Sequence, residues 1–218
     1  MRRKNERKAI CVFFMVLAIS VMMSACANAE LVTISISAEV NNVEDIGNVF
    51  GGAIQSGDII TGYYTYDSDT SDTNPSTTVA DYWQTSIASE FMLSVKGLEF
   101  RTDASNPNFL LEIVNDNTVG GLHDAYGVVS YENVVLTGGT IVEVIYIGMT
   151  DYTATALLDT SLPIDAPTLS DWEVKELCIE TSRVFRIDAS LTSIELVPEP
   201  ASIFLIAIGA MLIRKITR

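Results

Sequence analysis

Histidine, cysteine and basic side chains are scarce in this chain, and their scarcity removes several classes of function. A single histidine, His123, and three cysteines occur among 218 residues. A zinc centre, a Ser-His-Asp triad or a Cys-His pair draws on such residues, so the sequence offers little material for any of them. Cys11 and Cys26 lie within the first 29 residues, which leaves Cys178 alone in the rest of the chain. An internal disulfide framework is therefore excluded there.

Positive charge is nearly absent from the middle of the chain. Only five of the 13 basic residues, but 26 of the 28 acidic residues, lie between Glu30 and Val197, where the net charge is −21. A surface of that sign repels nucleic acid and anionic lipid head groups, so we expect neither as a partner. It either keeps an exported protein soluble or attracts divalent cations.

The N-terminus has the three parts of a secretory signal peptide. Five basic residues precede an apolar run over residues 9–23, and Ala27-Asn28-Ala29 fits the small-x-small cleavage rule. We therefore predict a signal peptide over residues 1–29, Sec export, and a mature chain that starts at Glu30. Met23-Ser24-Ala25-Cys26 also approaches a lipobox, so lipidation of Cys26 is an open alternative.

The C-terminus changes character at Pro198. Two prolines, Pro198 and Pro200, cannot continue a strand, so they end the folded body. The apolar run over residues 201–213 is 13 residues long. As a helix it would span roughly 20 Å, against roughly 30 Å of bilayer hydrocarbon. Basic residues then close the chain. We predict a short transmembrane helix; an ordinary anchor or a buried core helix is the alternative, but neither requires Pro198-Glu199-Pro200.

A Pro-Glu-Pro motif, one short apolar helix and a basic end, in that order, resemble the PEP-CTERM sorting signal of Gram-negative bacterial surface proteins. The resemblance covers residues 198–218. It implies that Pro198, Glu199 and Pro200 are recognised by an exosortase, after transient anchoring in the inner membrane. It also implies delivery to the envelope, outer surface or extracellular matrix, in association with exopolysaccharide or biofilm. The resemblance assigns no molecular activity to the body of the chain.

The body, residues 30–197, reads as a succession of short strands. Apolar residues alternate with polar ones from Val32 to Val40, and turn residues separate further segments of the same kind. A change of phase near Thr192-Ser193 predicts a β-bulge. We predict an all-β domain, an antiparallel, jelly-roll-like β-sandwich, flanked by the signal helix and the C-terminal membrane helix. The predicted strands cover residues 32–40, 59–66, 80–85, 90–95, 98–102, 109–115, 125–131, 133–137, 141–147, 152–158, 172–180 and 184–197.

An acidic loop follows the second predicted strand. Asp67, Asp69 and Asp72 place oxygen ligands at short spacing, which hard cations such as Ca²⁺ prefer. The loop is not an EF-hand, because Asp72 stands where the turn glycine belongs and Thr78 replaces the closing glutamate. A calcium site and a solvated turn are both open.

Aromatic residues flank the same loop. Strand alternation places Tyr64 and Tyr66 with the core residue Ile60, and Tyr63 on the opposite, solvent-facing side. Aromatic rings on a sheet face can stack on sugars. Tyr63 and Trp83 are therefore the candidate saccharide-binding residues.

Two further groups bear on chemistry. The many carboxylates could supply a glycosidase pair, but so many acidic residues produce pairs by chance, and we predict no enzyme. Strand alternation places Cys178 on the same face as Glu176 and Glu180. It is either an inert, partly buried thiol or the site of an intermolecular disulfide. The sequence thus predicts a non-enzymatic envelope or matrix protein without a required cofactor. The alternative is a saccharide-binding module, with or without help from calcium.

Overall fold

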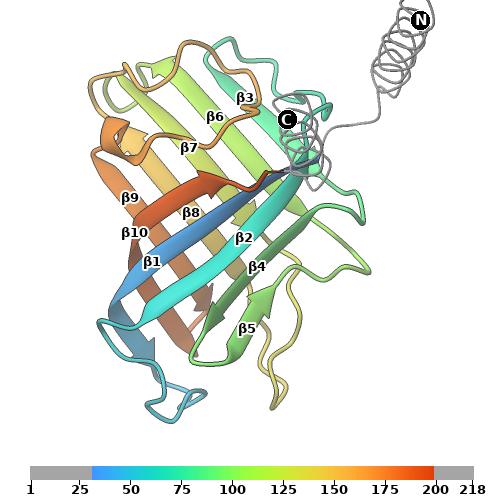
Figure 1. Ribbon diagram of the computed structural model, residues 1–218, viewed down its shortest axis with the longest axis vertical. Coiled ribbons are helices and arrows are strands. Elements are labelled where there is room, and N and C mark those ends of the chain that lie inside the picture. The colour runs from blue at the N-terminus through green and yellow to red at the C-terminus, as the bar shows by residue number, and fades with distance from the viewer. Residues whose placement is uncertain (1–30, 199–218) are drawn as a thin grey trace, which may run out of the picture. The chain divides into compact units, whose positions relative to one another are not determined.

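The computed structural model describes residues 31–198, which form an antiparallel all-β fold (Figure 1). Within this range the one helical element is the short 3₁₀ turn η1 (Leu169–Asp171), and no helix there is long and apolar enough to span a bilayer. The ten strands are β1 (Leu31–Asp45), β2 (Ile59–Asp67), β3 (Val79–Gln84), β4 (Glu90–Val95), β5 (Leu98–Arg101), β6 (Phe109–Asn117), β7 (His123–Ser130), β8 (Val144–Asp151), β9 (Val174–Thr181) and β10 (Phe185–Leu196).

All ten strands belong to one hydrogen-bonded sheet in the order β3-β6-β7-β8-β9-β10-β1-β2-β4-β5. The first and last strands of the chain lie side by side at its centre. Their register passes from Ser37 opposite Ser193 to Ala38 opposite Leu191, which leaves Thr192 as an extra residue. The β-bulge predicted from the change of phase is therefore confirmed.

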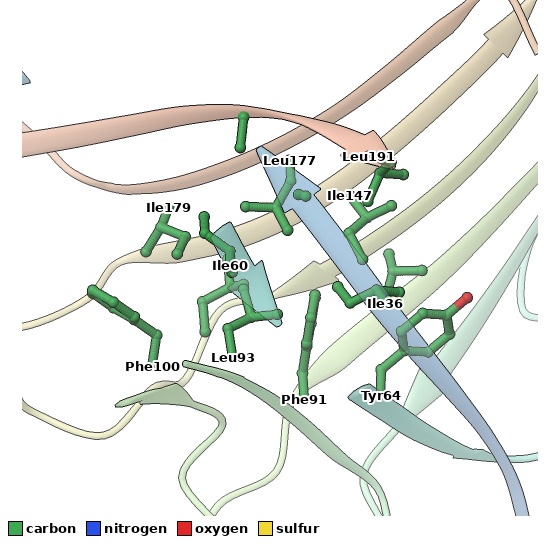
Figure 2. Packing of buried hydrophobic residues seen from close by; sticks show 14 of the residues in the cluster. Ile36, Ile60, Tyr64, Phe91, Leu93, Phe100, Ile147, Leu177, Ile179 and Leu191 are labelled. Atoms are coloured by element: carbon green, nitrogen blue, oxygen red, sulfur yellow. The ribbon is translucent and has the colours of Figure 1, made fainter. Parts of the chain in front are cut away.

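The sheet is curled, so that its two halves face each other across one core. Figure 1 shows β1, β2 and β4 lying across β6, β7 and β8. The hydroxyls of Tyr64 on β2 and Tyr126 on β7 meet at 2.9 Å inside that core. Figure 2 shows side chains of both halves, among them Ile60 and Ile147, pointing toward one another. The antiparallel all-β class is thus confirmed, in the form of one continuous curled sheet.

Alternation in the sequence decides which side chains enter this core. Along β1, Val32, Ile34 and Ile36 are buried while Thr33 and Ser35 face outward. A hairpin joins β4 to β5, the strands predicted over residues 90–95 and 98–102, and its turn residues Lys96 and Gly97 both have positive φ. This is the conformation of a tight two-residue hairpin turn.

Two predicted strands, residues 133–137 and 152–158, are wrong, and side chains that capture backbone groups explain both errors. The Asn133 amide donates to the carbonyls of Ser130 and Val142, and these bonds hold the segment after β7 in an irregular conformation. The Asp151 carboxylate accepts the backbone N–H of Thr153, and two more amides that follow it, so these groups are not free for a strand ladder.

Both sequence signals lie outside the described residues. These are the signal peptide 1–29 with its cleavage residues Ala27, Ala29 and Glu30, and the sorting signal from Glu199 onward. Of the Pro-Glu-Pro motif only Pro198 is described, two residues after the end of β10.

Candidate saccharide-binding site

The outer face of β3, β6, β7 and β8 carries an aromatic surface. Strand alternation turns Ala80 and Tyr82 of β3 into the core and leaves Asp81 and Trp83 on the outside. Trp83 stacks on Tyr131, which follows the end of β7, with ring centroids 5.9 Å apart and an interplanar angle of 28°. Trp83 is 38% exposed and Tyr131 40% exposed, so the stack presents aromatic surface to solvent.

A hollow lies beside this stack, and Gly127 is part of its lining. Gly127 of β7 and Gly148 of β8 are directly paired, and neither places a side chain on the outer face. A Cβ added to Gly127 would meet only Glu112, at an ordinary contact distance of 3.7 Å, whereas the Tyr146 ring lies over Gly148. The hollow has a volume of about 230 Å³, and Leu110, Val129, Tyr131, Tyr146 and Glu112 line its walls.

Strand register aligns three carboxylates with the two glycines. Asp81 is paired with Glu112, Glu112 with Gly127, and Gly148 with Glu176. One straight row across the outer face therefore reads Asp81, Glu112, Gly127, Gly148, Glu176. In this row, carboxylates stand on both sides of the glycine pair.

The charge of Asp81 acts on Glu112, and the charges of Glu176 and Glu112 act on the Tyr146 hydroxyl. Partial loss of solvation, followed by the negative charge of Asp81, raises the pKa of Glu112 above its ordinary value. Burial, with the charges of Glu176 and Glu112 adding to it, raises the pKa of the Tyr146 phenol to about 12. Tyr146 and Glu112 therefore both lie in a negative electrostatic potential that neighbouring cations among residues 31–198 do not offset.

The acidic loop after β2 holds Asp81 in place. The Asp81 N–H donates to Asp72 Oδ1 at 2.9 Å, and its carbonyl accepts the N–H of Thr73 at 3.0 Å. The loop thereby covers the outer edge of β3, which has no partner strand on that side. Asn74 donates to Asp81 Oδ2, while Asp81 Oδ1 is buried without a hydrogen-bond partner among residues 31–198.

The three aspartates predicted for calcium are engaged in the turns of this loop. Asp67 Oδ1 accepts the N–H of Asp69, and Asp72 Oδ1 accepts the N–H groups of Asn74 and Asp81. Across the described part of the chain, no group of three or more acidic, histidine or cysteine side chains is placed to hold a metal ion. Calcium binding by Asp67, Asp69 and Asp72 remains a prediction.

Of the two predicted saccharide residues, only Trp83 lies next to the hollow, because its ring stacks on Tyr131, which lines the hollow. Tyr63 lies on the outer face of β2, paired with Ser35 and Met92, and its hydroxyl donates to Glu90 at 2.8 Å. Six strands separate β2 from β3 in the sheet order. Tyr63 faces outward, as alternation predicts, but on another part of the surface.

Residues with reactive side chains lie outside the hollow. His123 begins β7, and its Nδ1 is 2.8 Å from the carbonyl oxygen of Gly121. Cys178 is buried on the outer face of β9 as a free thiol. Burial raises its pKa to about 12, and nearby Glu180 adds to this while Arg186 opposes it. A thiol held in its protonated form is a poor nucleophile.

Sequence reasoning missed Glu112, Tyr131, Tyr146 and Gly127, which line the hollow. Alternation along each strand already indicates an outward Glu112 and an outward Tyr146. What the sequence lacks is the order β3-β6-β7-β8, which brings together residues separated by up to 65 positions in the chain.

Comparisons of this chain with protein-family models, with curated proteins and with solved structures find no match.

Proposed function

We propose that this chain is an exported, non-enzymatic saccharide-binding protein of the cell envelope or extracellular matrix. One observation carries the proposal: the exposed Trp83–Tyr131 stack borders a hollow that contains hydrogen-bond acceptors. The C–H face of a sugar ring packs on aromatic rings, and its hydroxyls donate to carboxylates such as Glu112. A volume of about 230 Å³ suits one ring of a longer chain that lies along the surface.

The cellular part of the proposal rests on the two terminal segments of the sequence. A signal peptide over residues 1–29 directs export through Sec, and the PEP-CTERM-like tail is the substrate of an exosortase. Strand β10 ends at Leu196, which supports a sorting signal that starts directly after the folded body. Binding of exopolysaccharide would then retain the released domain in the matrix.

The fold suits a binding module. The two facing halves of the curled sheet correspond, in our proposal, to the two layers of the jelly-roll-like sandwich predicted from the sequence. One core shared by both halves supports an outer face whose side chains are positioned by strand register rather than by loops. A site on strands is pre-organised, which lowers the entropy lost on binding.

Calorimetric titration of the full chain in mild detergent with oligosaccharides of four sugar units tests the binding. Trp83→Ala and Tyr131→Ala are expected to weaken binding about tenfold or more, because each removes half of the aromatic stack. Tyr63→Ala is the matched control and is expected to bind like the unmodified protein. Equal loss in all three variants, or no binding of any oligosaccharide, contradicts the proposal; release of new reducing ends contradicts its non-enzymatic part.

Intact mass spectrometry of the protein from its native host tests the sorting. The expected mass starts at Glu30 and ends near Pro198 to Pro200. A mass that retains Arg218 would show a permanent anchor, and a lipid-bearing Cys26 would replace simple export by lipidation.

A further inference from the structure

We propose that the hollow selects sugars that carry a protonated amine, such as glucosamine units, over N-acetylated or uncharged ones. This inference names the ligand class of the saccharide-binding site and therefore rests on the function proposed above.

The outer face around the hollow carries carboxylates but no basic side chain in its paired rows. Three parallel rows of paired residues cross β3, β6, β7, β8 and β9, and the central one holds Asp81, Glu112 and Glu176. None of these three rows contains a lysine, an arginine or a histidine. The flanking rows are Trp83, Leu110, Val129, Tyr146, Cys178 and Val79, Val114, Ala125, Thr150, Val174.

The absence of a cation in these rows is unusual for side chains that are partly removed from water. Arg186 is the nearest outward cation in the register, on β10, and it already pairs with Glu180 and Asp188. Asp81 and Glu112 are register neighbours and repel each other, and the raised pKa of Glu112 reflects the loss of solvation and the charge of Asp81. A bound ammonium group would relieve this repulsion.

Asp81 Oδ1 is a buried carboxylate oxygen without a hydrogen-bond partner in the described part of the chain. Buried acceptors are almost always satisfied, so an orphan of this kind calls for an explanation. Asp81 is the register neighbour of Glu112 on the outer face. The positive charge of an amine bound at Glu112 would offset part of the cost of this unpaired, negatively charged oxygen.

Aromatic rings form part of the wall of the hollow. Tyr131 and Tyr146 line the hollow together with Glu112, and Trp83 stacks on Tyr131. Aromatic faces attract ammonium groups within about 6 Å of the ring centroid, and tryptophan does so most strongly. Rings and carboxylates in combination therefore favour an amino sugar, whereas rings alone would accept any sugar. Uronic acids and sulfated sugars are disfavoured by the same charges.

The test compares three tetrasaccharides with the full chain at a pH where amines are protonated and carboxylates ionised. They are built from glucosamine, from N-acetylglucosamine and from glucose, in the same linkage. The glucosamine tetramer is expected to bind about tenfold or more tightly than the other two, with an affinity that falls as salt is added. Spermine is the control for attraction of any polycation to an acidic protein, and is expected to bind more weakly and without dependence on Trp83.

Variants locate the effect. Glu112→Gln is expected to weaken glucosamine binding about tenfold more than it weakens binding of the N-acetylated tetramer, so that the preference for the amine is lost. Glu39→Gln removes the same charge from the outer face of β1 and is expected to change neither. Melting temperatures verify that both variants are folded, and Glu176→Gln serves as a second variant.

The outcomes separate the two proposals. Equal affinity for all three tetrasaccharides, or an unchanged preference in both Glu112→Gln and Glu176→Gln, overturns the amine selectivity and leaves saccharide binding in place. Spermine binding as tight as the glucosamine tetramer also overturns it, because charge alone would then suffice. If no tetrasaccharide binds, saccharide binding and amine selectivity are both refuted.

Discussion

The contact between Tyr64 and Tyr126 offers the sharpest test of the curled sheet, because the two residues lie on strands that are not neighbours in the ladder. Both side chains are buried, with exposed fractions of 0% and 1%, and their hydroxyls are 2.9 Å apart. Replacing one tyrosine by phenylalanine leaves the other hydroxyl buried without its partner, which costs about 1–3 kcal/mol. Replacing both removes the unsatisfied group and is nearly neutral.

A double-mutant cycle measures this difference. Urea unfolding of Tyr64→Phe, Tyr126→Phe and the double variant gives the free energy of unfolding of each. We expect the double variant to be more stable than either single one, with a coupling energy of at least about 1 kcal/mol. Tyr152→Phe, at a residue that is 63% exposed, is the control and is expected to change stability by less than about 0.5 kcal/mol. Additive losses would show that the hydroxyls do not meet, and would refute the packing of β2 against β7.

Alkaline pH probes the same pair. Burial raises the pKa of both tyrosines well above the ordinary value of 10, so the folded state keeps its protons where the unfolded state loses them. The folded state is fully favoured below pH 10, and stability falls as pH rises above it, by up to about 1.4 kcal/mol per pH unit for each tyrosine. Unfolding monitored with the absorbance of ionised tyrosine measures this slope, which is expected to be smaller in the double phenylalanine variant. Equal slopes would contradict the burial.

Three further predictions concern other parts of the sheet. Gly62→Ala is expected to lower the free energy of unfolding by about 3 kcal/mol, since the new Cβ would collide with the backbone carbonyl of Met92. Gly127→Ala is the control: its Cβ meets only an ordinary contact, so the same urea assay is expected to show that it is tolerated. Hydrogen bonds from the hydroxyl and N–H of Thr153 and from further amides lower the pKa of Asp151. Its contribution to stability is therefore present above pH 4 and lost as pH falls below it; Asp151→Asn is expected to flatten the acid limb of an unfolding curve, and an unchanged limb would contradict this. Cys178 is expected to resist alkylation in the native protein and react on unfolding, as followed by mass spectrometry; fast native alkylation, or a dimer band on a non-reducing gel, would show an accessible thiol.

The local elements of the fold follow from the sequence because their causes are local. Alternation of apolar and polar residues fixes β1, the Lys96-Gly97 turn fixes the β4–β5 hairpin, and the change of phase fixes the bulge at Thr192. Strand prediction fails over residues 133–137 and 152–158, where Asn133 and Asp151 capture backbone groups. Composition and alternation do not show such capture, because its partners are set by neighbouring strands and loops.

The candidate site divides in the same way. That Tyr63 and Trp83 face outward and that Tyr64 and Tyr66 enter the core can be predicted from the sequence, since each depends only on the period of its own strand. Which outward residues share a surface depends on the order of the strands. That order places Trp83 with Tyr131 and with Glu112 of β6, and leaves Tyr63 elsewhere. Pairing between distant strands depends on how the whole sheet buries its core, and no single strand carries that information.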